Sequence, residues 1–425
     1  MKKIVLITTG QPSANPRVVK EADALQAAGF EVTVLYSFIT QWAQQKDKAL
    51  LQRIKWNYKL AGGSPGENKW QYSFTRLRSK LAAILISLAG PRFLLAERIQ
   101  ATAFDELLQE AKKIKADWYI GHNLGAMAVA VKAAKFHGAK AGFDFEDYHR
   151  GEFDAADKQT IQRIIFLENK YVPALACFTA SSEMITAAIK KDHPHFQQHP
   201  ASPAAALKSA GYKPPPAGGS GARGATIRNC FPLTQQPNFN KKDEDDTSLT
   251  LFWFSQTIGL NRGLEALIDA LQILSDVSIH LTLAGRCDEE MKTYIKIYGG
   301  NIVDNIHLAG IIGPEALPTF AAQFDVGISL ELTIPLNRNI CLTNKIFTYL
   351  LAGNAIILSE TAMQAAFNKV YQVGEMVSGV NSLVEKIKYY QNKDNLNRQK
   401  LHNYTLAKTE LNWEKESEKL LELIF

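Results

Sequence analysis

The chain has 425 residues, of which 46% are hydrophobic and 21% charged, and its formal net charge is +6. This composition is ordinary for a globular protein, and the length allows two or three domains. The four cysteines lie far apart, so we expect reduced thiols in a cytosolic protein and no disulfide framework or metal site. The N-terminal apolar run is too short for a signal peptide, and no stretch reaches the roughly 20 apolar residues of a membrane span.

The first 36 residues predict one β-loop-α-β unit. Residues 3–7 and 32–36 are apolar or β-branched runs typical of buried strands. Between them, Asn15 can cap a helix, Pro16 suits its first position and Gly29 can end it. Such units form parallel sheets that bind ligands beyond the carboxyl ends of their strands, and the loop after the first strand lies there.

Residues 51–100 carry nine Lys or Arg side chains against Glu67 and Glu97, so most of the net charge is localised there. The same segment contains the apolar run 81–89 and two tryptophans, Trp56 and Trp70. A basic, apolar and aromatic surface suits anionic lipid headgroups, and we expect contact with a membrane surface. The alternative is a core helix with a solvated basic end. No nucleic-acid recognition motif accompanies the charge, so we expect no nucleic-acid partner.

The rest of the first half alternates between strand and helix patterns. Strand patterns occur at residues 118–122, 140–145, 174–181 and 226–231. Helical patterns occur at residues 124–137 and 158–171. Residues 37–103 interrupt the alternation as a helical insertion, and residues 193–224, dense in Pro, Gly and Ala, predict a mobile loop.

The alternation restarts after a polar linker at residues 240–249. Strand patterns follow at residues 249–255, 279–285, 325–332 and 355–359, and helical patterns at 263–274, 342–352 and from about 380 onward. The fold class is therefore α/β, with two doubly wound Rossmann-like domains facing each other across a cleft. We predict domains at residues 1–232 and 245–405, and a final helix at 406–425 that packs back on the first domain.

Two loops of the second half suit a phosphate. After the strand at 249–255, a polar loop includes Ser255, Gln256 and Arg262, and the Arg262 guanidinium can pair with a diphosphate. Further on, Asn344 and Lys345 fall in the first turn of a helix, where backbone N–H groups and the helix dipole favour an anion. The lysine opposes that dipole, so we expect an anion to compensate it. The alternatives are an ordinary surface arginine and a solvated lysine.

Several ordered motifs together resemble family 4 of the two-domain GT-B glycosyltransferases. They are "TTGQPSANPRVVKEADALQAAGFEVTVL", "DWYIGHNLGAMAVAVKAAKFHGAKAGFDFEDYHRGE", "QTIGLNRGLEALIDAL", "LTLAGR" and "TNKIFTYLLAGNAII". The resemblance covers nearly the whole chain apart from residues 37–103 and 193–224. It implies transfer of a sugar from a nucleotide donor, usually with retention of anomeric configuration.

The resemblance also implies roles for individual residues. Asn344 and Lys345 match the family's Asn-Lys pair and would contact the diphosphate or ribose. Arg262 matches the family's basic residue before Gly-Leu, and Gly10 matches its glycine loop near donor and acceptor. His122 matches a histidine that points at the transferred sugar. Lys345, Arg262 and His122 are thus the predicted catalytic residues. The alternative for His122 is an ordinary strand-end histidine.

The chain departs from the family at its pair of glutamates separated by seven residues. Thr348 and Ile340 stand at those positions, so the pair is missing. Glu331 is the nearest acidic substitute, and a ribose contact and an ordinary strand-end role are both open for it. Gln256 stands where many relatives have arginine. We nevertheless expect Glu331, Gln256 and Thr348 on the donor side of the site, together with Ser255.

Acceptor contacts are expected in the first half. The acidic residues Asp144, Glu146 and Asp147 gather at the end of the strand at 140–145 and can bind acceptor hydroxyls or the transferred sugar. The alternative is that they cap the next helix and solvate a loop. Asn15 and Arg17 follow the Gly10 loop, and Arg17 lies where an anion would offset its charge. For that loop, a plain strand-to-helix connection is the alternative.

The functional prediction is therefore a hexosyltransferase that moves a sugar from a UDP- or GDP-linked donor. The acceptor would be a polysaccharide or a lipid-linked glycan, and the location the cytoplasm at the inner membrane face. Fixed cations and dipoles can stabilise the leaving diphosphate, so we expect no metal and no cofactor beyond the nucleotide sugar. Two alternatives stay open, a catalytically impaired sugar-nucleotide-binding protein and a nucleotide-sugar epimerase on the same fold.

Overall fold

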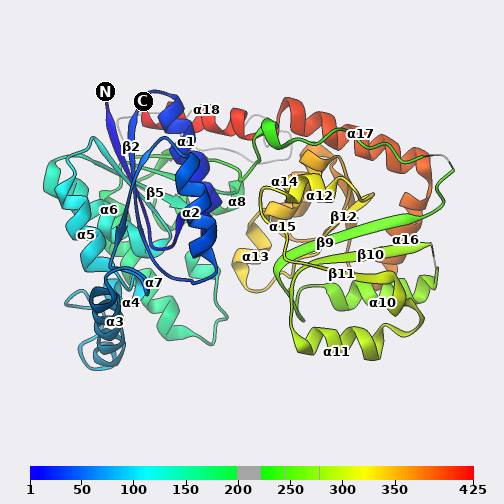
Figure 1. Cartoon of the computed structure of the whole chain (residues 1–425), viewed down its shortest axis with the longest axis horizontal. Coiled ribbons are helices and arrows are strands. Elements are labelled where there is room, and N and C mark those ends of the chain that lie inside the picture. The colour runs from blue at the N-terminus through cyan, green and yellow to red at the C-terminus, as the bar shows by residue number, and fades with distance from the viewer. Residues whose placement is uncertain (199–221, 244, 277) are drawn as a thin grey trace. The chain divides into compact units, whose positions relative to one another are not determined.

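A computed structural model describes residues 1–198, 222–243, 245–276 and 278–425 of the chain. Most of the predicted mobile loop at 193–224 lies outside the described residues. The described chain divides into two compact units (Figure 1). The first unit contains residues 1–198, 222–227 and 417–425, and the second contains residues 228–416.

The first unit is built on a parallel sheet whose strands, among the described residues, are arranged in the order β3-β2-β1-β4-β5-β6-β8-β7. These strands are β1 (Lys3–Thr8), β2 (Glu31–Ser37), β3 (Asn57–Ala61), β4 (Trp118–His122), β5 (Lys140–Phe145), β6 (Cys177–Ala180), β7 (Gln197–Gln198) and β8 (Arg223–Thr226). Apolar runs fill the central strands because both faces are covered by helices. Figure 1 shows α5 and α6 on one face and α1 and α2 on the other.

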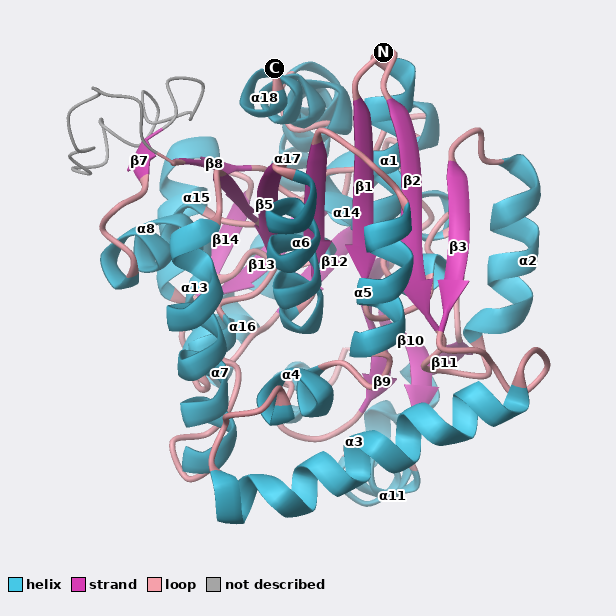
Figure 2. Ribbon diagram, turned by 90° about the vertical axis from the view of Figure 1, so that its left-hand side faces the viewer, coloured by secondary structure: helices cyan, strands magenta, loops and turns pink. Residues whose placement is uncertain are grey.

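The first unit contains the described helices α1 (Pro16–Ala27), α2 (Ala43–Arg53), α3 (Lys69–Ala89), α4 (Leu95–Gln100), α5 (Phe104–Lys113), α6 (Leu124–His137), α7 (Lys158–Tyr171) and α8 (Glu183–Asp192). Side-chain caps mark the starts of some of them, namely α1, α3, α7 and α8. The predicted cap is confirmed, since the Asn15 side chain accepts a hydrogen bond from the Val18 backbone N–H. Figure 2 shows α3 running past the carboxyl ends of β1, β2 and β3.

Two predictions in this half are wrong. The strand expected at 226–231 ends at Thr226, because the following backbone turns to other partners: the Ile227 carbonyl accepts from Arg17, and the Arg228 N–H donates to Glu416. The insertion at 37–103 is not purely helical, since β3 pairs in parallel with β2. Because β3 is an edge strand with exposed side chains, it lacks the apolar run of a central strand.

The second unit is built on a parallel sheet in the order β11-β10-β9-β12-β13-β14. Its strands are β9 (Leu249–Ile258), β10 (Ile279–Cys287), β11 (Ile306–Gly310), β12 (Val326–Ser329), β13 (Ala355–Ser359) and β14 (Gly374–Val377). Its helices are α10 (Leu264–Leu274), α11 (Glu289–Tyr298), α12 (Leu317–Ala321), α13 (Leu336–Ile340), α14 (Asn344–Ala352), α15 (Ala362–Tyr371), α16 (Val380–Gln391), α17 (Lys393–Thr409) and, at its start, α18 (Trp413–Ile424). Helices α10 and α11 cover one face, and α12 and α14 the other (Figure 1).

The strand orders confirm the predicted fold class for each unit and show where ligands are expected. Each sheet contains the doubly wound order 3-2-1-4-5-6, which reverses direction between β1 and β4 in the first unit and between β9 and β12 in the second. Doubly wound sheets bind ligands beyond the carboxyl ends of the strands at this switch point. Both predicted loops, the one at Gly10 and the one at Arg262, follow a strand that borders a switch point.

Candidate functional site

At the switch point of the second unit, Lys345 forms an ion pair with Glu331. The lysine lies in the first turn of α14, and its Nζ is 2.6 Å from Oε1 of Glu331, which follows β12. The side chains are only 11% and 14% exposed, and the ammonium lies 5.4 Å from the ring centroid of Trp253 on β9. The anion expected to compensate Lys345 is therefore present within the protein. An ammonium has three N–H donors, so the ion pair fixes Lys345 and leaves donors for a ligand.

Two arginines at the same switch point have no carboxylate partner among the described residues. Arg262 donates from Nη1 to the Ser255 hydroxyl at 3.1 Å, and Arg338 donates from Nη1 to the Asn261 carbonyl at 3.2 Å. Both bonds go to neutral oxygens, so each guanidinium keeps its full charge for an anion. The structure thus brings together the predicted Ser255 and Arg262. Arg338 was missed as a site residue, although its place in the polar "LNRN" segment before α14 is a signal that could have indicated it.

The loop that carries Arg262 approaches β12 closely because residue 263 is glycine. Gly263 has a φ of +78°, and a Cβ atom there would lie 2.8 Å from the Cβ of Leu330. A larger residue would clash and would also adopt a left-handed conformation that favours glycine. The glycine therefore brings the Arg262 loop and the Glu331 segment into contact.

The other predicted donor residues differ in their access to solvent. Asn344 and Gln256 are exposed, and the Asn344 Oδ1 accepts a hydrogen bond from Asn229 at 2.7 Å. Thr348 is fully buried and donates its hydroxyl to the Asn344 carbonyl at 2.9 Å, so it would act on a donor only through Asn344. Thr343 takes the N-cap position of α14, but its hydroxyl makes no capping hydrogen bond. The start of α14 thus lacks a side-chain cap, which suits an anion.

At the switch point of the first unit, side chains hold the Gly10 loop in place. The Thr8 hydroxyl donates to Oδ1 of Asn123 at 2.9 Å, which joins the ends of β1 and β4. The buried Gln11 donates its amide to the Thr40 carbonyl at 2.8 Å and accepts from the Thr40 N–H at 2.9 Å. A Cβ atom on Gly10 would make only an ordinary contact, so the fold itself does not require glycine there. The glycine instead leaves space beside the loop.

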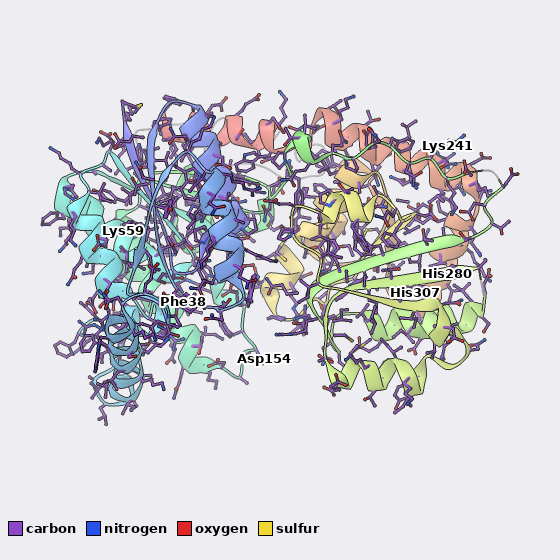
Figure 3. The ribbon with its side chains drawn as sticks, in the orientation of Figure 1. Phe38, Lys59, Asp154, Lys241, His280 and His307 are labelled. Atoms are coloured by element: carbon purple, nitrogen blue, oxygen red, sulfur yellow. The ribbon has the colours of Figure 1, made fainter. Side chains whose placement is uncertain are left out.

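A cavity of about 130 Å³ opens beside this loop. Its lining includes Thr9, Phe38, Thr75 and Arg76, and the last two belong to α3. Figure 3 labels Phe38, whose backbone carbonyl accepts a hydrogen bond from Arg76 at 3.2 Å. The cavity therefore lies between the carboxyl ends of the strands and α3, and most of its polar lining is neutral.

Four charged residues of the first unit form a buried cluster near the Gly10 loop. They are Arg17, Glu21, His122 and Asp144. Arg17 donates to both carboxylate oxygens of Asp144, at 2.6 and 2.8 Å, and to the Ile227 carbonyl at 2.7 Å. His122 lies between two carboxylates, with Nε2 3.1 Å from Glu21 and Nδ1 3.4 Å from Asp144. The side chains of Arg17, Asp144 and His122 are at most 2% exposed. Each ring nitrogen therefore has a carboxylate oxygen close to it, and this arrangement favours the doubly protonated, charged ring.

The pKa values of the cluster follow from these contacts. Burial by itself lowers the pKa of His122, but Glu21 and Asp144 outweigh it and raise that pKa to about 10. Burial would raise the pKa of Asp144, yet Arg17 and His122 hold it well below its usual range. At neutral pH the cluster therefore contains two cations and two anions. Asn15, whose side chain caps α1, is also buried. Of the residues predicted to bind the acceptor, Asn15, Arg17 and Asp144 are therefore buried inside the unit.

Glu146 differs from the cluster because its carboxyl titrates near neutral pH. Burial and the neighbouring Asp147 carboxylate raise its pKa to about 7. Both residues follow β5 and are partly exposed. A carboxyl group with this pKa can bind a hydroxyl as a hydrogen-bond acceptor or take up its proton.

Other arrangements lie away from the switch points. His280 and His307, labelled in Figure 3, stack with ring centroids 5.9 Å apart near the amino ends of β10 and β11. Within the described residues, no three His, Cys, Asp or Glu side chains are arranged to hold a metal ion. In the same part of the chain, every helix falls short of the length and apolarity that crossing a membrane requires.

Two successive doubly wound units, each in the order 3-2-1-4-5-6, define the GT-B fold. Solved structures that are similar over the whole chain confirm it. HepE of Anabaena in complex with UDP matches with a TM-score of 0.66 at 13% identity, covering 100% of this chain and 99% of that one. Sucrose-phosphate synthase of Thermosynechococcus elongatus gives 0.66 at 13% identity, with 100% and 98% covered. TarM gives 0.64 at 11% identity, again with 100% and 98% covered.

Sequence comparisons add nothing to this fold assignment. No model of a known protein family matches the chain, and no curated protein matches it by sequence. The resemblance to family 4 therefore stays a prediction, while the GT-B fold is established by structure.

Proposed function

We propose that the chain is a glycosyltransferase that takes a sugar, a hexose in the simplest case, from a UDP- or GDP-linked donor held by the second unit. The observation that carries the proposal is the pair Arg262 and Arg338, whose guanidinium groups lack a carboxylate partner among the described residues. The fold likeness supports the same class of donor, since HepE has been solved with UDP and with UDP-glucose. A diphosphate would supply the missing negative charge.

The residues of the second unit suit the leaving group of this reaction. When the bond from the anomeric carbon to the phosphate oxygen breaks, negative charge builds up on the diphosphate. Arg262, Lys345 and the first N–H groups of α14 are fixed before the reaction, so they stabilise that charge without reorganisation. In this scheme the diphosphate needs no metal ion. Retention of configuration also belongs to the proposal, with a leaving phosphate oxygen taking the proton of the acceptor hydroxyl.

The first unit supplies the acceptor side of the proposal. Glu146 and Asp147 would bind acceptor hydroxyls after β5. His122 would act through Asp144 and Arg17, because its ring is enclosed by carboxylates. The proposed acceptor is a polysaccharide or a lipid-linked glycan, reached at the inner membrane face through residues 51–100. The proposed role of the protein is therefore in polysaccharide biosynthesis, as a peripheral membrane enzyme.

A donor-consumption assay tests the proposal. The purified chain is incubated with UDP-glucose or a GDP-sugar in the presence of a chelator, and nucleotide release is measured. Lys345→Ala should lower the rate by about 100-fold, the size expected for losing one preorganised charge-stabilising donor. The matched control is Lys386→Ala, which removes a similar lysine–glutamate ion pair with a 2.6 Å contact to Glu375. Full activity of Lys345→Ala would exclude Lys345 from the diphosphate site.

One observation keeps a second candidate function open, a binding protein without turnover. The usual glutamate pair is replaced by Ile340 and Thr348, and Thr348 is buried. Calorimetry separates the two candidates. Binding of UDP-glucose without release of UDP, in the presence of a range of glycan acceptors, would favour the binding protein.

A further inference from the structure

Helix α3 of the first unit presents a continuous apolar stripe to solvent. Its side chains recur at spacings of four and three residues and are between 49% and 89% exposed. They are Trp70, Phe74, Leu77, Leu81, Ile84 and Leu88. At 100° per residue they fall within an arc of about 80°, and they extend about 27 Å along the helix. Soluble proteins rarely leave such a large apolar surface uncovered, which indicates a docking surface.

The opposite side of α3 is fixed to the body of the unit. Thr75 and Ala82 are buried there. Arg76 donates to the Phe38 carbonyl, and the Arg78 side chain donates to both oxygens of Glu106, at 3.0 and 2.6 Å. The stripe is therefore not the result of a helix that has lost its partner, since α3 already has a packed face. Its apolar face is additional and points away from the unit.

Charge beside the stripe indicates what covers it. Lys69 and Lys80 are exposed and lie about 80–100° from the centre of the stripe, the position from which a lysine reaches the headgroups of a bilayer. Trp70 stands at the start of the helix, and tryptophan favours the membrane interface. A second copy docked through the same stripe would bring two basic segments together, whereas anionic lipids would neutralise them.

We infer that α3 lies in the plane of an anionic bilayer, with its apolar stripe inserted between the headgroups. The inference deepens the proposed membrane contact by naming the element and its lipid partner. None of the described helices can cross a membrane, so α3 lies on the bilayer and does not span it. The cavity lined by Thr9 and Arg76 is on the other side of α3 from the stripe. An inserted α3 therefore holds the Gly10 loop about one helix diameter, roughly 10 Å, from the headgroups.

Vesicle sedimentation of the full chain tests this inference. The chain should bind vesicles of phosphatidylcholine with about 30% phosphatidylglycerol far better than vesicles of phosphatidylcholine alone. Ile84→Gln/Leu88→Gln should lower binding by at least tenfold, since each buried methylene contributes about fourfold. The matched control is Ile273→Gln/Ile297→Gln, which replaces exposed aliphatic residues of the second unit. Lys69→Gln/Lys80→Gln should weaken only the binding to anionic vesicles, by about fivefold for each lysine.

Two further readouts keep the test decisive. Addition of anionic vesicles should shift the fluorescence of Trp70 to the blue, and Trp70→Phe should remove that shift. The substituted stripe residues are exposed, so thermal melting of the variants should match the unchanged chain. Absence of vesicle binding, or equal loss in the control, would overturn the inference. So would a dimer that dissociates in Ile84→Gln/Leu88→Gln without any vesicle binding. UDP-glucose consumption in solution is measured on the same variants, so failure of membrane docking is distinguished from failure of the proposed transferase activity.

Discussion

Replacing Asp144 by Asn tests whether the buried charges hold the first unit together. Asp144 accepts two hydrogen bonds from Arg17, at 2.6 and 2.8 Å, and one from the Thr179 hydroxyl at 2.5 Å. His122 lies 3.4 Å away. Asparagine keeps the shape of the side chain but removes its charge, so two cations remain buried with Glu21 as counterion. Removing one partner of a buried ion pair costs about 3–5 kcal/mol, and we expect a loss of that size in the free energy of unfolding.

The loss should be specific to the first unit. Urea unfolding at pH 7, followed by hydrogen exchange of the β4 and β5 amides, measures the stability of that unit. The matched control is Asp105→Asn, because Asp105 also accepts two bonds from an arginine, Arg98, at 2.9 and 3.2 Å, and lies 2.9 Å from a second arginine, Arg78. These ion pairs are partly exposed, so their removal should cost about 1 kcal/mol or less. A loss in Asp144→Asn no larger than in the control would refute the reasoning.

The pH dependence gives the same prediction a second readout. The pKa of Asp144 is depressed in the folded chain, so its stabilising contribution is complete above its ordinary pKa and is lost as the pH falls through the depressed value. The difference between the unchanged chain and Asp144→Asn should therefore be full between pH 5 and pH 8. It should shrink below about pH 4.

Three other substitutions follow from the same geometry. The pKa of Glu146 is raised to about 7, so its charge destabilises the folded chain above that pH and has no effect below its ordinary pKa. Urea unfolding should therefore show that Glu146→Gln raises the free energy of unfolding by up to about 2 kcal/mol at pH 8 and leaves it unchanged at pH 4. Glu331→Gln removes the negative charge that neutralises Lys345, so calorimetry should show that UDP binds several-fold more tightly. Unchanged binding would exclude Lys345 from the phosphate contacts. Gly263→Ala places a Cβ atom 2.8 Å from the Leu330 side chain at a φ of +78°. It should lower the free energy of unfolding of the second unit by about 1–3 kcal/mol, and a loss below about 0.5 kcal/mol would contradict the close approach.

The sequence predicts the central elements, some of them with the bounds that the structure has, but it misses strands at the edges of the sheets. Strands β4 and β5 and helix α6 agree residue for residue, because buried runs and the glycine at 138, with its φ of 65°, mark sharp ends. Strands β3 and β11 were missed. Each is the edge strand of its sheet and carries mostly exposed side chains, so its sequence lacks the apolar run on which strand prediction depends.

The pairing of charges could not be predicted either. Lys345 and Arg17 were both expected to need an external anion, but Glu331 lies 14 positions from Lys345 and Asp144 lies 127 positions from Arg17. No local pattern reports such a pair, because the topology of the sheet decides which strand ends meet. What the sequence does predict is the edge of each sheet at which these residues collect.

The distribution of paired and unpaired charge decides which unit suits a diphosphate. At the switch point of the first unit, Arg17 and His122 are buried and matched by Asp144 and Glu21, so an incoming anion would find no uncompensated cation in that cluster. At the switch point of the second unit, the described residues leave two partly exposed arginines bound only to neutral oxygens. A charge that is already paired and fully buried gains little from a ligand, whereas a partly exposed guanidinium gains a bidentate partner. The charges at the switch point of the second unit therefore fit the proposed diphosphate site better than those of the first unit do.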